Sequence, residues 1–242
     1  MIIGLLEAET LPPKIIKEYG SYGEMFVTFL NKTPNDFSFR FYTVDQQHLP
    51  LTINECDAYI VTGSRCNAFD DIPWINDLKD FIRELYKAQK KCFGVCFGHQ
   101  IIAEALGGKV ERNSKGWGVG AKLFETVHQP SWAAQTPDYF TILVSHQDQV
   151  TRLPSRATLF ATSEYCTIGA YFIDDFIFCL QGHPEFNSQY LSYLLTKRRS
   201  ILGASVSDNA LNSLLISIDE TYLQALVLGF FKTQKSPQKV AN

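Results

Sequence analysis

The segment Lys91–Gln100, KCFGVCFGHQ, constrains the fold more than any other part of the chain. Its first half is apolar or small after a charged run, which predicts a short buried strand over Cys92–Val95. Apolar residues then recur at helical spacing over 101–106, so a helix is expected to begin directly after Cys96. A cysteine placed where a strand turns sharply into a helix is typical of a nucleophile elbow, in which a strained turn lifts the side chain above the sheet.

Two interpretations of Cys96 remain open from this segment alone. A helix N-terminus favours the thiolate, which is the reactive form of cysteine. A buried structural cysteine in an ordinary strand–helix unit is the alternative, because free cysteine is often buried. The six cysteines, at positions 56, 66, 92, 96, 166 and 179, show no spacing typical of a disulfide framework and fit a reducing cytoplasm. No second Cys/His pair lies near Cys92 and Cys96, so no metal site is expected.

The order of the expected elements predicts an α/β fold. Strands and helices alternate over the first hundred residues, with strands over 2–6, 37–41, 57–63 and 92–95 and helices over 22–30, 73–85 and 97–106. Such alternation is typical of a mostly parallel open sheet with helices on both faces and sites at the strands' C-terminal ends. Further short strands over 109–127, 140–144, 159–162 and 168–172 predict a small antiparallel addition. An apolar strand over 176–182 and a helix from Asn187 follow.

Length and composition limit the classes of protein to consider. The 242 residues suit one domain over 1–200 with a helical C-terminal extension over 201–232 and a disordered tail over 233–242. The extension is expected to pack on the same domain or to form the surface of a homodimer. The net charge of −3 and the lack of a basic stripe argue against a nucleic-acid partner. No apolar run is long enough to span a membrane, and the N-terminus lacks the features of a signal peptide, so a cytoplasmic protein is expected.

Two histidines follow predicted strands and are candidates for the base that a nucleophilic cysteine needs. His183 lies in His183-Pro184-Glu185, where the rigid proline lets the carboxylate at i+2 orient the imidazole. Ends of adjacent strands lie roughly 5 Å apart, so Cys96 and His183 can meet although they are distant in sequence. His146, in Ser145-His146-Gln147-Asp148, has neighbours better suited to substrate contact. Either histidine, taken alone, also fits a structural role.

Several motifs together resemble the class I glutamine amidotransferase domain. Gly94-Val-Cys-Phe-Gly-His-Gln100 is followed by Gly182-His-Pro-Glu185, and the similarity is strongest to the free-standing GMP synthase-like branch, which is related to gamma-glutamyl peptidases. Supporting stretches, in order along the chain, are Thr62-Gly-Ser64, Asp70–Ile75, Ala105–Val110, Lys115-Gly-Trp117 and Val144–Val150. The resemblance covers roughly residues 40 to 195 and implies a flavodoxin-like sheet.

The resemblance also implies roles for individual residues. Cys96 would be the nucleophile that forms a γ-glutamyl thioester, His183 the general base and acid, and Glu185 its orienting partner. Backbone N–H groups of Phe97 and of the Gly63-Ser64 turn would stabilise the oxyanion. The α-amino and carboxylate end of the substrate would be contacted by Gln100, Ser145, His146, Gln147 and Asp148. No metal or other cofactor is implied.

The function expected from these motifs is hydrolysis of a γ-glutamyl amide, of the glutamine amidotransferase or glutaminase type. One version uses glutamine and passes ammonia to a separate acceptor subunit, and no ATP pyrophosphatase domain or P-loop is expected within these residues. The alternative is a gamma-glutamyl peptidase that acts alone on a γ-glutamyl peptide or conjugate. A catalytically quiet regulatory or binding module on the same fold is a second alternative. Arg65, beside the Gly63-Ser64 turn, either binds a substrate carboxylate or is a solvated loop residue, and Cys66 receives no role.

Overall fold

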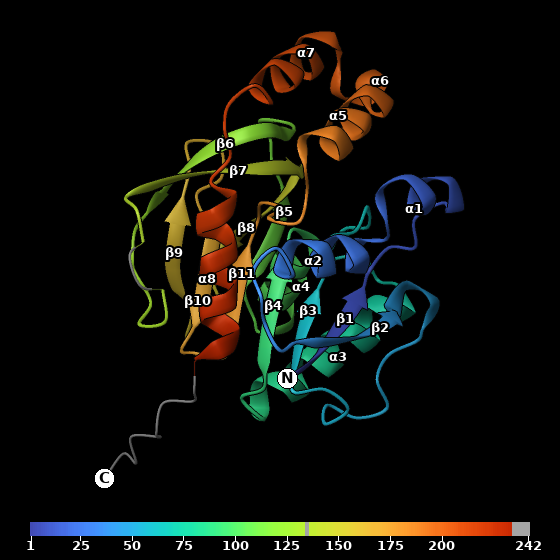
Figure 1. Cartoon of the computed structure of the whole chain (residues 1–242), viewed down its shortest axis with the longest axis vertical. Helices are drawn as coiled ribbons and strands as arrows, with labels where there is room; N and C mark the ends of the chain where they lie inside the picture. The colour runs from blue at the N-terminus through green and yellow to red at the C-terminus, as the bar shows by residue number, and fades with distance from the viewer. Residues whose placement is uncertain (134–135, 234–242) are drawn as a thin grey trace.

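A nine-stranded sheet forms the centre of the protein in the computed structural model, which describes residues 1–133 and 136–233 (Figure 1). The strand order is β2-β1-β3-β4-β11-β10-β9-β6-β7. Its first five strands are mutually parallel: β2 (Ser38–Thr43), β1 (Ile2–Glu7), β3 (Ala58–Val61), β4 (Lys91–Val95) and β11 (Ile177–Leu180). The C-terminal ends of these strands therefore meet at one edge, where sites of α/β proteins lie.

The remaining four strands pair antiparallel to one another, so that the last of them, β7, ends at the same edge of the sheet as the parallel strands. These four strands are β10 (Ala170–Ile173), β9 (Thr158–Thr162), β6 (Gly118–Thr126) and β7 (Tyr139–His146). The last of them, β7, reaches the segment that follows β11, where the His183 N–H donates to the Leu143 carbonyl at 2.7 Å. A separate two-stranded antiparallel ribbon pairs β5 (Lys109–Arg112) with β8 (Asp148–Arg152). The antiparallel strands thus bring the C-terminal half of β7 beside the residues after β11.

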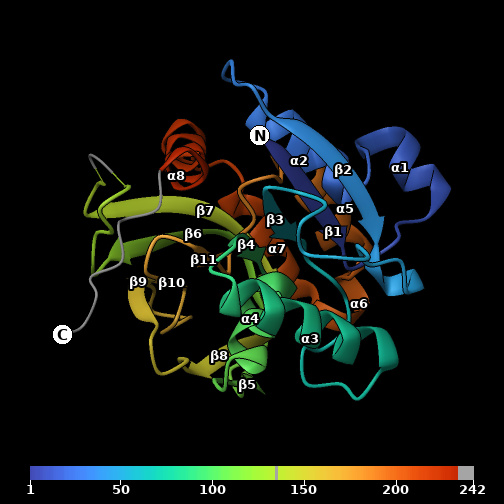
Figure 2. The ribbon, with the colours of Figure 1, turned by 90° about the horizontal axis from the view of Figure 1, so that it is seen from below.

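Helices cover both faces of the parallel strands (Figure 2). On one face α2 (Tyr22–Leu30) and α8 (Glu220–Lys232) share a core with Ile3 and Leu5 of β1. On the other, α3 (Pro73–Lys87) and α4 (Phe97–Ala105) share a core with Leu6 of the same strand. Ile3 and Leu5 point to one face of the sheet and Leu6 to the other, because successive side chains of a strand point to opposite faces. This arrangement confirms the predicted mostly parallel sheet with flanking helices.

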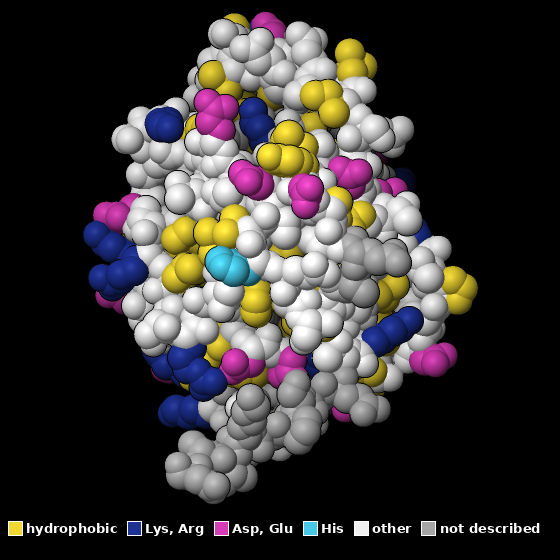
Figure 3. Space-filling view, turned by 90° about the vertical axis from the view of Figure 1, so that its left-hand side faces the viewer, with side chains coloured by type: hydrophobic (Ala, Val, Ile, Leu, Met, Phe, Trp, Pro, Cys, Tyr) yellow, Lys and Arg dark blue, Asp and Glu magenta, His cyan; other side chains and the backbone are white. Residues whose placement is uncertain are grey.

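A third group of helices lies at the top and right of Figure 1. It contains α1 (Pro13–Tyr19), α5 (Ser188–Lys197), α6 (Arg199–Leu202) and α7 (Ala204–Ser213), which share a third core with β6, β7 and the start of α2. One 3-10 turn, η1 (Val44–Gln46), follows β2. On the side formed by the antiparallel strands, exposed apolar side chains lie as separate small groups among polar and charged ones (Figure 3).

Two glycines allow the strand and helix of the Cys96 segment to pack closely. A Cβ on Gly98 would lie 2.2 Å from the Val61 carbonyl oxygen of β3. A Cβ on Gly94 would lie 2.6 Å from the Gly98 carbonyl oxygen. Real Cβ atoms do not approach backbone this closely, so any larger residue would push α4 away from β3 and β4. The spacing of these glycines around Cys96 therefore serves helix–strand packing.

Most of the elements expected from the sequence are present, and the structure adds α1, η1 and β8, which the sequence pattern does not indicate. Helix α1 occupies part of the segment after β1, where no helix is expected from the sequence; Pro13 stands at its first turn, a position that proline favours. Most of the predicted tail, 234–242, lies outside the described residues, and residue 232 still belongs to α8. The division into a domain over 1–200 and an extension over 201–232 stays a prediction. Among residues 1–133 and 136–233, none of the helices combines the length and the apolar character that spanning a membrane requires.

Candidate active site

Cys96 stands on a strained turn between β4 and α4. Its backbone has φ 54° and ψ −102°, outside the regions that residues with a Cβ ordinarily adopt. The Cys96 N–H donates to the Leu180 carbonyl of β11 at 2.9 Å, and its carbonyl accepts the Gln100 N–H at 3.1 Å. These two bonds tie the turn to both the sheet and the helix. The predicted strand–turn–helix geometry is confirmed, and Cys96 faces a cavity of about 530 Å³.

His183 reaches Cys96 from the neighbouring strand. Strands β4 and β11 pair in parallel, with Val95 opposite Leu180, so the residues just after each strand come together. Gly63, after β3, completes the group: a Cβ built on it would lie 3.0 Å from His183 Cε1 and 3.8 Å from Cys96 Cβ. The Cys96 side chain is close enough to the imidazole to raise the pKa of His183. Three adjacent parallel strands thus place a thiol, an imidazole and an open backbone turn around one point.

Glu185 holds the opposite side of the imidazole. Its Oε1 lies 2.7 Å from His183 Nδ1, and its side chain is fully buried. This contact leaves Nε2 as the ring nitrogen that faces Cys96. Burial by itself lowers the pKa of His183, but the negative charges of Glu185 and Cys96 outweigh it and raise that pKa to about 10. The protonated form of the imidazole is therefore favoured at neutral pH.

The Gly63-Ser64 turn is anchored to the end of β1 by Glu9. The Arg65 N–H donates to Glu9 Oε2 at 2.8 Å, and the Arg65 guanidinium lies 3.6 Å from Oε1. Burial raises the pKa of Glu9, and the adjacent Arg65 acts against this increase. Phe97 is the first residue of α4, and N–H groups in the first turn of a helix have no partner within the helix. Backbone donors at Gly63, Ser64 and Phe97 thus come from the two segments that flank Cys96.

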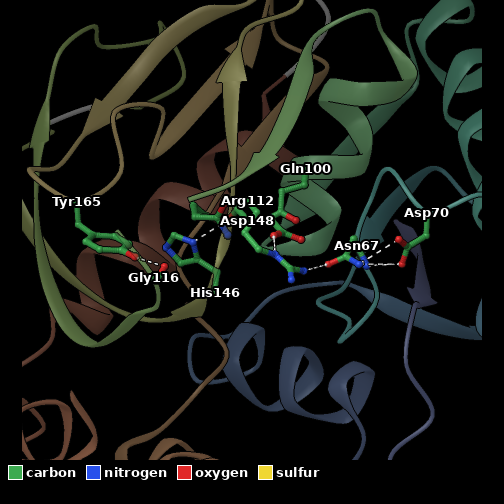
Figure 4. Close-up of polar contacts among 9 residues, drawn as sticks. Asn67, Asp70, Gln100, Arg112, Gly116, His146, Asp148 and Tyr165 are labelled. Carbon is green, nitrogen blue, oxygen red and sulfur yellow. Dashed lines mark hydrogen bonds and ion pairs between the residues drawn. The ribbon is translucent and has the colours of Figure 1, made fainter. Parts of the chain in front are cut away.

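The predicted substrate-contacting residues all line the cavity, but several of them also bind one another. Gln100 donates through Nε2 to the Asp148 carbonyl at 2.8 Å and to Gln181 Oε1 at 3.1 Å. His146 contacts the same Asp148 carbonyl through Nδ1 at 3.1 Å (Figure 4). Burial lowers the pKa of His146 to about 4, so its ring is neutral. Gln100 and His146 therefore fix the loop between β7 and β8 in place.

A chain of polar contacts crosses the cavity rim from this loop to the loop after β3. Asp148 Oδ1 lies 3.2 Å from Arg112 Nε, and Arg112 donates through Nη2 to Asn67 Oδ1 at 2.9 Å. Asn67 in turn bonds the carboxylate of Asp70, as Figure 4 shows. The Asp148 carboxylate, expected to pair with a substrate ammonium, thus already has a guanidinium neighbour from β5. Arg112 links the two loops that carry the predicted substrate contacts and the oxyanion turn.

Several cavity residues are not identified from the sequence. Phe186 stacks on the His183 ring, with 3.8 Å between centroids and 6° between planes. Arg198, at the end of α5, donates to Ser145 Oγ at 3.0 Å and lies over the Trp117 ring at 5.7 Å. An aromatic directly after His183-Pro-Glu185 could have suggested Phe186. Nothing in the run Lys197-Arg198-Arg199 separates Arg198 from its neighbours, because all three fit a basic helix C-terminus.

No cation site accompanies these groups in the part of the chain that the structure describes. Within it, no group of three or more His, Cys, Asp or Glu side chains is arranged to hold a metal ion. Cys66 lines the cavity beside Arg65, and burial raises the pKa of its thiol. The thiol of Cys96, the imidazole of His183 and the backbone N–H groups beside them suit acyl transfer at a cysteine.

The chain belongs to the class I glutamine amidotransferase family, whose family model matches residues 15–198. It is similar to gamma-glutamyl peptidase 3 of Arabidopsis thaliana, with 36% identity over 72% of this chain and 73% of the relative. Gamma-glutamyl peptidase 4 of the same organism is 32% identical over 91% of each chain. Among solved structures, a glutamine amidotransferase of Thermotoga maritima has a TM-score of 0.76 at 20% identity, over 96% of this chain and 98% of that one. The structural likeness confirms the predicted fold class.

Proposed function

We propose that the protein hydrolyses a γ-glutamyl amide bond through a γ-glutamyl thioester on Cys96, releasing an amino acid or peptide. The observation that carries this proposal is the meeting of Cys96, His183 and Gly63 at the ends of three adjacent parallel strands. Family membership supports the γ-glutamyl group as the acyl part. Relatives named gamma-glutamyl peptidases support an amine larger than ammonia as the leaving group.

The first half of the reaction forms the thioester. The Cys96 sulfur attacks the γ-carbonyl carbon, and the oxygen that becomes negative accepts hydrogen bonds from backbone N–H groups of Phe97 and the Gly63-Ser64 turn. Each such donor is worth on the order of 10²–10³ in rate at comparable sites. The His183 Nε2 proton passes to the amide nitrogen, the C–N bond breaks, and the amine leaves.

The second half returns the enzyme to its starting state. Neutral His183 takes a proton from water while the oxygen of that water attacks the thioester carbon. Collapse of the intermediate expels the Cys96 thiolate and releases glutamate. Glu185 stays ionised in both halves, fixing Nδ1 as the protonated nitrogen and stabilising the imidazolium. The α-amino and α-carboxylate groups of the substrate's glutamyl part would lie against Gln100 and Asp148.

Hydrolysis of glutamine with transfer of ammonia to an acceptor protein is the second candidate. It is favoured by similarity to a glutamine-hydrolyzing GMP synthase of Petrotoga mobilis, at 27% identity over 166 residues, which are 68% of this chain and 31% of the relative. The same thioester serves both candidates, because only the leaving group differs. A comparison of substrates therefore separates them.

Purified protein should be assayed for amine release from γ-glutamyl dipeptides and for ammonia release from glutamine. We expect the dipeptides to have the higher kcat/KM and acid-quenched protein to carry a γ-glutamyl adduct on Cys96 by mass spectrometry. Cys96→Ala should abolish turnover and the adduct, whereas Cys92→Ala, at a fully buried thiol of the same segment, should retain both. Rapid hydrolysis of glutamine alone would favour the second candidate. No adduct and no turnover with either substrate would contradict the proposal and favour a binding or regulatory module.

A further inference from the structure

We infer that Arg198 forms a leaving-group subsite that binds the carboxylate of a γ-glutamyl amino acid with an apolar side chain. This inference rests on the proposed function and narrows its substrate class. Three arginines line the cavity: Arg65, Arg112 and Arg198. The first two have carboxylate partners, Glu9 and Asp148. Arg198 differs from them: within residues 1–133 and 136–233, no carboxylate oxygen lies within 4.0 Å of its guanidinium nitrogens.

The direct contacts of Arg198 hold its guanidinium in place without an ion pair, and its charge acts only at longer range on the Glu9 carboxylate, which is paired with Arg65. It donates through Nη1 to the Ser145 hydroxyl at 3.0 Å and lies over the face of Trp117. The residue is half-buried, and five guanidinium N–H donors exceed the one hydroxyl contact that it makes there. A positioned guanidinium matches a carboxylate through two parallel hydrogen bonds. Arg198 is thus a cation in the cavity with capacity for an anionic ligand.

The place of Arg198 relative to His183 indicates which part of the substrate it contacts. His183 must protonate the leaving nitrogen, so the leaving group extends from the imidazole. The wall that continues from the imidazole begins with Phe186, which stacks on it, and Tyr190, whose hydroxyl donates to that of Tyr22 at 3.2 Å. Besides burial, the charge of Glu9 raises the pKa of both tyrosines and the charge of Arg198 lowers it, so both charged groups lie near this pair. Arg112, Gln100 and the Asp148 carboxylate belong to the other polar group, shown in Figure 4. Ser145, which the sequence places with that group, is bonded to Arg198 and is assigned to the leaving-group side.

The wall near Arg198 is mainly apolar and aromatic. It is formed by α1, the start of α2 and α5, with the segments that precede α1 and α5. Its residues are Leu11, Ile15, Tyr22, Phe186, Tyr190 and Leu194. An apolar surface beside the Arg198 guanidinium fits an amino acid that carries both a free carboxylate and an apolar side chain. Ammonia, the leaving group of glutamine, would use neither feature.

The test compares two substrates that differ only in this carboxylate. γ-Glutamyl-phenylalanine and γ-glutamyl-phenethylamide have the same scissile amide and the same ring. We expect kcat/KM of the purified wild type to be roughly 10- to 100-fold higher for the dipeptide, the range for a hydrogen bond to a charged group. Arg198→Gln should lower kcat/KM for the dipeptide by that factor and leave the phenethylamide and glutamine within about threefold.

The matched control is Arg199→Gln, one residue further along. It removes the same charge from an exposed side chain that is paired with Asp208. The ratio of kcat/KM for the dipeptide to that for the phenethylamide should therefore stay as in the wild type. Equal cleavage of the two γ-glutamyl substrates by the wild type would overturn the inference and leave the proposed function standing. A parallel loss with all three substrates in Arg198→Gln would assign Arg198 to the glutamyl end instead and also overturn it. Cleavage of neither γ-glutamyl substrate by the wild type would remove the proposed function and the inference together.

Discussion

The Phe186 ring lies parallel to the His183 imidazole, with 3.8 Å between the ring centroids and 6° between the ring planes. Together with the Glu185 contact at Nδ1 and the backbone bond to Leu143, this stacking leaves the imidazole little freedom to turn. The chain therefore fixes its candidate acid and base on three sides before substrate enters. Such fixation matters because proton transfer requires hydrogen-bond distance at the moment of bond cleavage.

Phe186→Leu should lower kcat more than it raises KM. The variant keeps an apolar side chain but loses the ring contact, which is worth about 0.5–1.5 kcal/mol for aromatic pairs, or roughly 2- to 13-fold in rate. Steady-state kinetics with a γ-glutamyl dipeptide measures both parameters. Phe186→Tyr keeps the ring and should retain near wild-type kcat. A kcat for Phe186→Leu equal to that of the wild type would show that the stack does not position His183.

Gly63→Ala should impair catalysis while the fold is retained. The added Cβ would lie 3.0 Å from His183 Cε1, tighter than ordinary contacts, so the imidazole or the turn must shift. Loss of alignment of one oxyanion donor predicts a fall in kcat on the order of 10²–10³. Ser64→Ala removes only a side chain and leaves the backbone donors, so its kcat should stay within a few-fold. If Ser64→Ala were as slow as Gly63→Ala, the hydroxyl and not the backbone would be the important group.

The charge on His183 predicts a dependence of stability on pH. Its pKa is about 10 in the folded chain and about 6.5 when exposed, so between these values the native state binds one more proton than the unfolded state. This contribution to the free energy of unfolding is complete below pH 6.5 and is lost as pH rises through 10. The contribution of His183 to the free energy of unfolding, measured by urea denaturation, should therefore fall between pH 6 and pH 10.

Glu185→Gln isolates this effect, because Glu185 supplies the largest of the influences that raise the His183 pKa. The variant should be less stable than the wild type at pH 6 and approach it as pH rises, and its kcat should fall by about 10²–10⁴. Glu164→Gln, the same charge change at an exposed bend, should give a curve parallel to that of the wild type. Parallel curves for Glu185→Gln as well would contradict the assigned cause.

Much of the fold was predictable because it depends on local signals. The apolar strand before Cys96, the spacing of α3 and the capped helix α2 each carry their own pattern, and parallel pairing follows from their alternation. Cys96, Gly63 and His183 could be brought together from sequence because each directly follows a strand of one sheet. Adjacent strand ends meet whatever the intervening chain does.

The rest of the cavity depends on contacts that no local pattern encodes. Arg198 is one of three basic residues at a helix end, and only the packing of α5 against β7 directs it to Ser145. Arg112 was predicted as part of a strand, and its partners Asp148 and Asn67 lie 36 and 45 residues away. Helix α1 forms part of the apolar wall of the cavity, but its seven residues are too few to show a clear helical period in the sequence. Long-range pairing of side chains, not secondary structure, therefore limited the prediction of the site.

The C-terminal extension should prove part of the same folding unit. Phe230 of α8 is fully buried, with its ring 5.2 Å from Trp132 and 5.8 Å from Phe178 of β11. Phe230→Ala should therefore lower the free energy of unfolding by about 3–5 kcal/mol, the range for large cavities in a core. Leu215→Ala, at a side chain that is 90% exposed, should change it by less than about 0.5 kcal/mol. Urea denaturation followed by far-UV circular dichroism measures both, and a single transition in each variant is expected. A cost below about 1 kcal/mol for Phe230→Ala would instead show that α8 separates from the sheet before the remainder unfolds, as an independent appendage would.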